Sequence, residues 1–211
     1  SAQSPAGKVV CVGLNYRDHI SEMNSQPGAE PVLFMNPSTA LASLEKPIAI
    51  PTTLGACHHE IEMMVLIGEQ LSQCREQEAG AAISGVGVAL DLTLRELQTQ
   101  LKQKGLPWDK SKAFDGACPA SAFVDRSRIA DLQDLRIRLT VNGEVRQQGS
   151  TAMMLTPVTK LIAYISEFFT LMPGDIVLTG TPAGVGPLST GDQLLVELDD
   201  LIDVSTEVVA R

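Results

Sequence analysis

The most informative stretch of this sequence is residues 58–67, His-His-Glu-Ile-Glu-Met-Met-Val-Leu-Ile. It predicts a β-strand over 60–67, because successive strand residues point to opposite faces and Ile61, Met63 and Val65 then share one face. Since that face is entirely apolar, we expect it to pack into the protein core.

The other face of this strand carries His58, Glu60 and Glu62, so two carboxylates point the same way. Like charges side by side on a strand repel each other, and a hard divalent cation would offset that repulsion. Asp91 can join them, because it lies between an apolar run and a predicted helix. Oxygen-only ligation by a few carboxylates suits Mg²⁺ or Mn²⁺. An alternative stays open, in which Asp91 caps the helix and both glutamates are solvated.

The remainder of the chain predicts many strands and few helices. Two helices are expected, one over 93–104 that opens with a T-x-x-E capping box at Thr93 and Glu96, and one over 156–172. A third, shorter helix is expected over 16–23. The pattern predicts an α+β, mostly β fold. Six further apolar runs bounded by turn residues are predicted strands: 8–14, 31–34, 85–90, 135–141, 175–179 and 193–198.

Length and composition bound the classes of protein. A chain of 211 residues without repeats or linkers predicts a single domain over 1–211. The net charge is −9 and no Lys/Arg cluster occurs, which disfavours nucleic acid as a partner. No apolar run approaches the roughly 18 residues of a membrane span, so no membrane association is expected. Residue 1 is Ser, so we expect the first few positions to be an artificial or truncated start.

The four cysteines lie far apart in the sequence and form no C-x-x-C pair, which argues against a zinc site. We expect them to be reduced and mostly buried thiols, and we therefore expect a cytoplasmic or otherwise reducing location. They also lack a motif that would support covalent catalysis.

Three further stretches carry side chains suited to catalysis. His19 and Glu22 are three residues apart, so a helical turn would bring them together, and a carboxylate beside an imidazole suits a water-activating base. A surface pair is the alternative. Lys112 would neutralise the charge of −1 that three carboxylates and one divalent ion leave. The Gly-rich segment 179–186 lacks the spacing of a dinucleotide or P-loop motif, so it is either a ligand-lining turn or a plain tight turn.

Seven segments in the same order resemble the fumarylacetoacetate hydrolase family, most closely its short acylpyruvate hydrolase/oxaloacetate decarboxylase branch. They are 13–22 (G-L-N-Y-x-x-H-x-x-E), 31–34 (P-V-L-F), 58–62 (H-H-E-x-E), 91–98 (D-L-T-L-R-E-L-Q), 112–114 (K-A-F), 141–144 (V-N-G-E) and 179–186 (T-G-T-P-x-G-V-G). The resemblance implies a mixed, rolled β-sheet fold with few flanking helices, and a homodimer.

The resemblance also implies the roles of individual residues. It assigns Mg²⁺ or Mn²⁺ to Glu60, Glu62 and Asp91. It further implies a lid that carries the catalytic pair His19 and Glu22, a catalytic lysine at Lys112, and substrate-binding positions at Arg95, Gln98, Gly180 and Thr181.

One position departs from the family pattern. Relatives often have F-x-K-P where this chain has Phe34-Met35-Asn36-Pro37, so an amide replaces a cation that could assist substrate binding. This puts the hydrolytic rate and the substrate range in doubt.

The expected function is Mg²⁺-dependent hydrolysis of the C–C bond of acylpyruvates, such as acetylpyruvate or fumarylpyruvate, to pyruvate and a carboxylic acid. The alternative is decarboxylation of oxaloacetate, or keto–enol isomerisation of a related dicarboxylic keto acid, on the same metal site. A third hypothesis is a catalytically silent metal-binding protein.

Overall fold

The computed structural model describes residues 7–23 and 30–211, so the first few positions, expected to be an artificial or truncated start, lie outside the described residues. Five α-helices occur in the described part: α1 (Arg17–Glu22), α2 (Glu76–Ala81), α3 (Arg95–Gln103), α4 (Asp109–Lys112) and α5 (Val158–Phe168). The strands of the first half are β1 (Lys8–Gly13), β2 (Val32–Pro37), β3 (Leu41–Ser43), β4 (Ile48–Ile50), β5 (Cys57–His59), β6 (Ile61–Ile67), β7 (Ile83–Leu90) and β8 (Thr93–Leu94). Those of the second half are β9 (Cys118–Ala120), β10 (Val124–Asp125), β11 (Arg136–Val141), β12 (Glu144–Ser150), β13 (Ile176–Leu178), β14 (Gly186–Pro187), β15 (Gln193–Leu198) and β16 (Ile202–Ala210).

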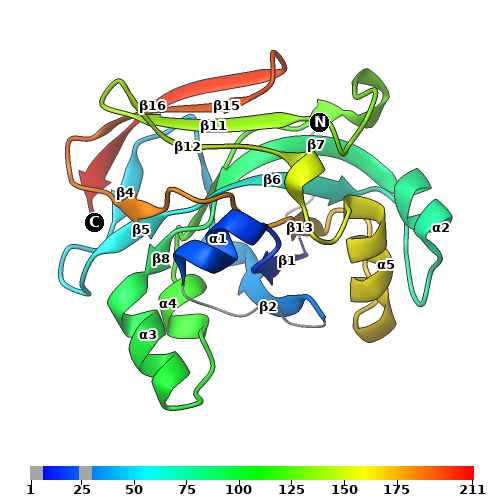
Figure 1. The fold of residues 1–211 in the computed structure, drawn as a ribbon, viewed down its shortest axis with the longest axis horizontal. Helices are drawn as coiled ribbons and strands as arrows, with labels where there is room; N and C mark the ends of the chain where they lie inside the picture. Colours follow the sequence, from blue (N-terminus) through cyan, green and yellow to red (C-terminus); the bar gives the residue numbers. More distant parts are fainter. Residues whose placement is uncertain (1–6, 24–29) are drawn as a thin grey trace.

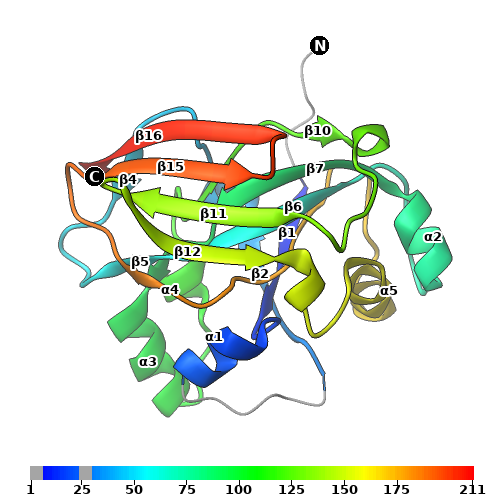
Figure 2. The same cartoon turned by 45° about the horizontal axis from the view of Figure 1, so that its top comes forward.

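The strands form three sheets of mixed direction (Figure 1). The largest has the order β2-β1-β13-β6-β7-β9-β3, with β10 paired to β7. A five-stranded sheet, β12-β11-β15-β16-β4, lies across it, and a three-stranded sheet, β14-β5-β8, lies near the start of β6 (Figure 2). Helices α3 and α4 lie side by side, as do α2 and α5. The α+β, mostly β prediction is confirmed.

The main core lies between the two larger sheets. Ile61, Met63 and Val65 of β6 are fully buried there, together with Ile137 and Leu139 of β11. This confirms the predicted apolar face of β6. The opposite face of the same sheet has a smaller apolar cluster, made of Val9, Cys11, Met64, Ala89, Cys118, Ile176 and Leu178. Glu60 and Glu62 share the side of β6 that carries Met64, so the polar face is enclosed as well.

All seven predicted strands and all three predicted helices are found, with ends shifted by a few residues. The capping box at Thr93 is wrong, because Thr93 belongs to β8 and pairs with His58 of β5. Helix α3 begins two residues later, after an N-cap residue, Leu94, that makes no side-chain capping bond. The strand pairing of Thr93 therefore outweighs its preference for a helix N-terminus.

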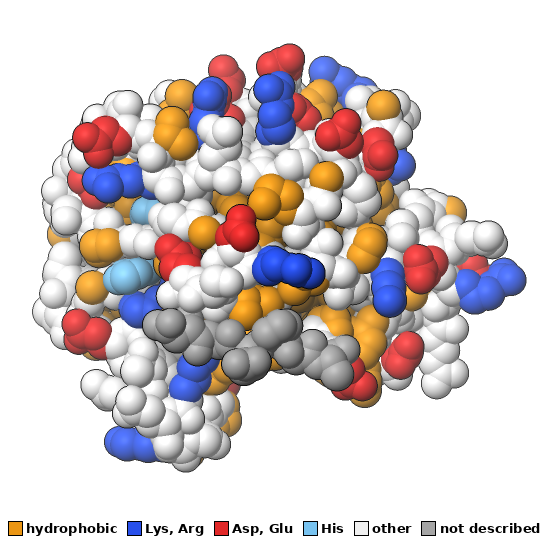
Figure 3. Space-filling view, viewed as in Figure 1, with side chains coloured by type: hydrophobic (Ala, Val, Ile, Leu, Met, Phe, Trp, Pro, Cys, Tyr) orange, Lys and Arg blue, Asp and Glu red, His pale blue; other side chains and the backbone are white. Residues whose placement is uncertain are grey.

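All four cysteines are free, and Cys11, Cys57 and Cys118 are buried, as expected for reduced thiols. Within the described residues, no helix is long and apolar enough to cross a membrane. On the face seen in Figure 3, positive and negative side chains are interspersed and neither sign covers a broad area.

Candidate metal centre and its pocket

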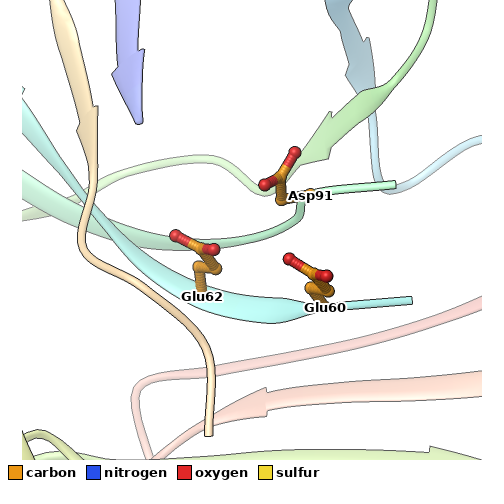
Figure 4. A group of neighbouring side chains, drawn as sticks. All are labelled: Glu60, Glu62 and Asp91. Atoms are coloured by element: carbon orange, nitrogen blue, oxygen red, sulfur yellow. The ribbon is translucent and has the colours of Figure 1, made fainter. Parts of the chain in front are cut away.

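Three carboxylates converge on one small space below the end of β7. Glu60 directly precedes β6, Glu62 is its second residue, and Asp91 directly follows β7, which pairs with β6 (Figure 4). Side chains two residues apart on a strand point to the same side, so Glu60 and Glu62 face the same way. The Asp91 N–H donates a hydrogen bond to the Glu60 carbonyl at 2.8 Å, which holds Asp91 beside them. One oxygen from each carboxylate lies within 4.8 Å of the other two. The geometry is that of a compact all-oxygen ligand set.

The three carboxylates are buried, with exposed fractions of 5% for Glu60, 1% for Glu62 and 1% for Asp91. The alternative of solvated glutamates is therefore wrong. Asp91 is not a helix cap either, because α3 begins four residues after it. A buried carboxylate needs a cation or hydrogen-bond donors to remain ionised.

Two cations partly meet that need. The Lys112 ammonium donates to Glu60 Oε2 at 2.8 Å and to Asp91 Oδ2 at 2.6 Å, and the Arg95 guanidinium donates to Glu60 Oε1. Within the described part of the chain, Glu62 accepts a hydrogen bond from the backbone N–H of Gly180, at 2.7 Å, and makes no ion pair. Three negative charges thus face two positive ones.

The pKa values of the three carboxyls diverge accordingly. Burial opposes ionisation of Glu60, but Lys112 and Arg95 outweigh it and lower the pKa of Glu60 from 4.5 to about 2. Burial raises the pKa of Asp91 from 3.8 to about 6, although Lys112 opposes this. Burial, followed by the charges of Asp91 and Glu60, raises the pKa of Glu62 well above its usual value. Burial lowers the pKa of Lys112, but Asp91 and Glu60 outweigh it, so the pKa of Lys112 rises.

The donor set fits a hard divalent cation. Asp91 Oδ1 is buried and has no hydrogen-bond partner among the described residues, and it belongs to one of the three converging carboxylates. An orphaned carboxylate oxygen is costly to bury, whereas a metal ion would satisfy it. Oxygen ligands without sulfur or imidazole suit Mg²⁺ or Mn²⁺.

Helix α1 brings His19 to the same pocket. His19 is buried, and its Nδ1 lies 3.1 Å from Glu22 Oε2. The other oxygen of Glu22 accepts the Gly184 N–H at 3.0 Å, which ties α1 to the 179–186 turn. Since Nδ1 is engaged by Glu22, Nε2 is the nitrogen of His19 that is left for a ligand. The expected His19–Glu22 pair is therefore formed.

One pocket collects most of the residues predicted from the sequence. Gly180 and Glu22 do not line it, although each contacts a residue that does. The predicted site residues that line it are His19, Glu60, Glu62, Asp91, Arg95, Gln98, Lys112 and Thr181, and they are joined by Val12, Gly13, Leu14, Met23, Phe34, Lys102 and Trp108.

The turn after β13 fits tightly against the residues that precede α1. Gly180 has a φ of +98°, and a Cβ at this position would lie 2.7 Å from the Asn15 Cβ. The Asn15 side chain in turn donates to the Thr179 carbonyl at 2.8 Å. The Gly180 N–H is used by Glu62, so this segment supports a carboxylate of the triad as well as lining the pocket through Thr181.

Gln147 of β12 was missed by sequence reasoning and lies at the centre of a buried network. Its Oε1 accepts the Ile61 N–H at 3.0 Å and lies 2.8 Å from His59 Nδ1, which therefore carries a proton. Its Nε2 donates to Thr181 Oγ1 and to the Pro182 carbonyl, each at 2.8 Å. Gln147 therefore fixes the position of Thr181 Oγ1, whose own hydroxyl donates to the Pro182 carbonyl over a long 3.5 Å.

Two other polar residues, His58 and Asn36, have buried side-chain atoms without a hydrogen-bond partner among the described residues. His58 is half-buried, and its Nδ1 has no partner among the described residues; it does not line the pocket. Asn36 is buried, and neither its amide nitrogen nor its oxygen has a partner in the described part of the chain. Asn36, which stands where relatives often have lysine, does not line the pocket that contains the triad.

Comparisons with known proteins agree with this geometry. Residues 8–209 match the family described as fumarylacetoacetate (FAA) hydrolase C-terminal. The chain is 55% identical to oxaloacetate tautomerase YcgM of Escherichia coli (strain K12) over 196 residues, covering 92% of this chain and 90% of that protein. It is 42% identical to the human mitochondrial oxaloacetate tautomerase FAHD1 over 200 residues, covering 95% and 90% respectively.

A solved structure extends the comparison to a metal-bound relative. It is fumarylpyruvate hydrolase from Pseudomonas aeruginosa in complex with Mn²⁺ and pyruvate, with a TM-score of 0.94 and 35% identity. The match covers 100% of this chain and 93% of that one.

Proposed function

The chain belongs to the fumarylacetoacetate hydrolase family, and on that premise we propose that it is a divalent-metal enzyme that interconverts the keto and enol forms of oxaloacetate. The observation that carries this proposal is the buried triad Glu60, Glu62 and Asp91, in one pocket with His19. Two relatives at 55% and 42% identity are named oxaloacetate tautomerase, which favours this reaction over hydrolysis.

We propose that Glu60, Glu62 and Asp91 hold Mg²⁺ or Mn²⁺. The ion would supply Lewis-acid polarisation of the keto acid when it is bound. Lys112 would remain between Glu60 and Asp91 and keep both ionised, because its ammonium already donates to one oxygen of each. The resulting site favours an anionic substrate rich in oxygen atoms.

His19 is the proposed proton carrier. Tautomerisation moves one proton between C3 and the oxygen on C2 and needs no attacking water. With Nδ1 held by Glu22, Nε2 of His19 would take the proton from C3 and return it to that oxygen, while Glu22 stabilises the imidazolium formed in between. His19 is only 5% exposed, which limits exchange of that proton with bulk water.

Substrate binding is assigned to donors of the pocket wall. Thr181 would turn its hydroxyl from its long bond to the Pro182 carbonyl toward the substrate, while Gln147 holds its oxygen in place. Arg95 and Gln98 line the same pocket, and the Arg95 guanidinium donates to Gln98 Oε1 at 2.8 Å as well as to Glu60. These donors suit the carboxylate groups of a keto acid.

Hydrolysis of acylpyruvates is the second candidate. The 35% identical fumarylpyruvate hydrolase with Mn²⁺ and pyruvate supports it. The His19–Glu22 pair would then activate a water molecule instead of moving a substrate proton. Both candidates use the same residues, so only product analysis separates them.

The test follows the enol absorbance of oxaloacetate and, separately, of acetylpyruvate, with Mn²⁺ and with excess chelator. Pyruvate and CO₂ are quantified in parallel, and metal without protein is the blank. We expect metal-dependent loss of oxaloacetate enol without pyruvate or CO₂. Pyruvate from acetylpyruvate as the only protein-dependent product would favour hydrolysis, and CO₂ from oxaloacetate would favour decarboxylation.

A further inference from the structure

A second basic residue of α3, Lys102, lies on the same side of the helix as Arg95 and Gln98. Arg95, Gln98 and Lys102 are spaced three and four residues apart, which places them on one helical face, and all three line the pocket. Lys102 lies about 10 Å beyond Arg95 along the helix axis, given the rise of about 1.5 Å per residue. The pocket wall therefore continues past the residues that touch the carboxylate triad.

Lys102 differs from the other two cations of this pocket in having no carboxylate partner. Arg95 and Lys112 both bind Glu60, whereas Lys102 forms no ion pair with any described residue. Its Nζ lies instead 4.7 Å from the centre of the Trp108 ring, and Trp108 packs against Phe34. An ammonium on an indole face is held in place but keeps its charge available to an anion.

The charges of the lining residues support an anionic ligand. With Glu60, Glu62 and Asp91 all ionised, as metal binding requires, their charges and those of Arg95, Lys102 and Lys112 sum to zero. A divalent ion on the triad would raise that sum to +2. A dicarboxylate dianion matches this charge, whereas a monocarboxylate leaves a charge of +1.

Burial, together with the charges of Arg95 and Lys112, lowers the pKa of Lys102, so the three cations act on one another. Their mutual repulsion would be relieved by an anion bound among them. Lys102 is the one of the three that makes no ion pair within the described residues.

We propose that Lys102, seated on Trp108, binds the carboxylate that is remote from the keto-acid end of the substrate, and thereby selects dicarboxylic over monocarboxylic 2-keto acids. This inference rests on the proposed function, because it takes the triad as the site of the keto-acid end. It assigns to Lys102 and Trp108 a role in specificity.

The first test measures binding without turnover. L-malate and 2-hydroxybutyrate are stable 2-hydroxy acids. Malate has a second carboxylate at the end remote from the hydroxy acid, where 2-hydroxybutyrate has a methyl group. Their affinities for the Mn²⁺-loaded protein are measured by calorimetry. We expect wild type to prefer malate, and Lys102→Met to bind malate about tenfold more weakly, the effect of one hydrogen bond to a charged group, with 2-hydroxybutyrate unchanged. Lys102→Arg should retain the preference.

Lys104→Met is the matched control, because Lys104 is exposed at the end of the same helix and does not line the pocket. It should leave both affinities unchanged. Equal binding of the two acids by wild type, equal weakening of both by Lys102→Met, or the same malate loss in Lys104→Met would each overturn the proposal.

A second measurement separates this inference from the proposed reaction. Exchange of the C3 protons in D₂O is followed by NMR for oxaloacetate and for 2-oxobutyrate, its monocarboxylic analogue. Suppose that wild type prefers malate, that Lys102→Met abolishes this preference, and that wild type catalyses no C3 exchange. The carboxylate-binding role of Lys102 would then be supported, and the proposed tautomerase activity would be contradicted. Failure of both acids to bind would contradict both.

Discussion

Glu60, Glu62 and Asp91 are chemically alike, but the protein treats their protons differently. Lys112 and Arg95 hold Glu60 ionised with a pKa of about 2, whereas burial raises the pKa of Asp91 to about 6 and that of Glu62 well above its usual value. A metal ion therefore has to displace protons mainly from Asp91 and Glu62.

This difference predicts a pH dependence of stability without metal. A carboxyl group whose pKa is raised by folding stabilises the folded state at pH values below its pKa in the unfolded chain. For Asp91 that unfolded pKa is near 3.8, and the stabilisation is lost as the pH rises through the folded pKa of about 6. Glu62 acts in the same direction, and the lowered pKa of Glu60 changes stability only below about 4.5. We expect this contribution to lower the melting temperature in chelator between pH 5 and pH 8, against an opposite contribution from His58 and His59, whose pKa values burial lowers.

Mn²⁺ should remove most of this fall, because it takes the place of the protons. The gain in melting temperature on adding Mn²⁺ is thus expected to grow with pH, as checked by differential scanning fluorimetry at fixed ionic strength. A metal gain of equal size at pH 5 and pH 8 would refute the assignment.

Gln147 gives a second prediction for a single residue. Gln147→Leu removes the donor to Thr181 Oγ1, which leaves the threonine hydroxyl free to turn away from the ligand. We expect KM for oxaloacetate to rise about tenfold, the effect of one lost hydrogen bond to a charged group, with a smaller change in kcat.

The double variant with Thr181→Val supplies the control for Gln147. In the Thr181→Val background, Gln147→Leu should raise KM little further, because the group that it positions is already absent. Steady-state kinetics of the four proteins measure this coupling. Fully additive effects on KM would show that Gln147 acts through general destabilisation.

The carboxylate triad was predictable from the sequence, whereas Gln147 was not. Glu60 and Glu62 follow from the period of a strand, and Asp91 from its place at the end of an apolar run. Gln147 lies in a strand without a distinctive pattern and contacts His59 and Thr181, which are 88 and 34 residues away in the chain. A contact over such distances leaves no local signal.

At the scale of single elements, α3 shows how a short strand changes a helix. Thr93 pairs with His58 in β8, and its hydroxyl donates to the Asp91 carbonyl at 3.1 Å, so it does not cap the helix. As a result α3 begins at Arg95, and its polar face points into the pocket. The two-residue strands β8 and β14 are too short to have a recognisable period, which is why the sequence did not predict them.

The 179–186 turn gives a prediction at this scale. A Cβ on Gly184 would lie 2.1 Å from the Arg146 carbonyl oxygen of β12, and the φ of +99° is strained for any other residue. Gly184→Ala should therefore push the turn away from β12 and from Glu22, which accepts the Gly184 N–H. We expect a loss of about 1–3 kcal/mol in unfolding free energy and reduced kcat.

Chemical denaturation and steady-state kinetics check this prediction. Gly191→Ala is the control, because Gly191 has a similar φ of +94° but nothing within 4 Å of the added Cβ. It should lose stability from backbone strain while keeping kcat. Equal loss of kcat in both variants would argue against a specific role of the turn.

At the scale of the whole molecule, the sequence predicted the fold class but not the strand order. β1 pairs with β13 in parallel, about 167 residues later in the chain, and this pairing brings the turn after β13 beside α1 and the triad. The alternation of apolar and polar residues predicts where a strand lies. It does not predict which strand pairs with which when the two are so far apart in the chain. The family resemblance added the expectation of a mixed, rolled sheet, but it did not give the order of the strands.

The homodimer stays a prediction at this scale. A chain of 22.5 kDa would then elute with a mass of about 45 kDa in light scattering coupled to gel filtration, twice the monomer mass. A mass near 22 kDa across the micromolar range would contradict the prediction.

The most direct test of the central claim is a Mn²⁺ titration of oxaloacetate enol consumption, with bound Mn²⁺ measured in parallel by electron paramagnetic resonance. The proteins are wild type, Glu62→Gln, and Glu69→Gln as a control at an exposed glutamate outside the pocket. We predict that wild type and Glu69→Gln bind one Mn²⁺ and gain activity in step with its binding. Glu62→Gln should lose more than the roughly 10- to 100-fold in metal affinity that removal of an outer-shell partner costs. Undiminished Mn²⁺ binding and activity in Glu62→Gln would contradict the account.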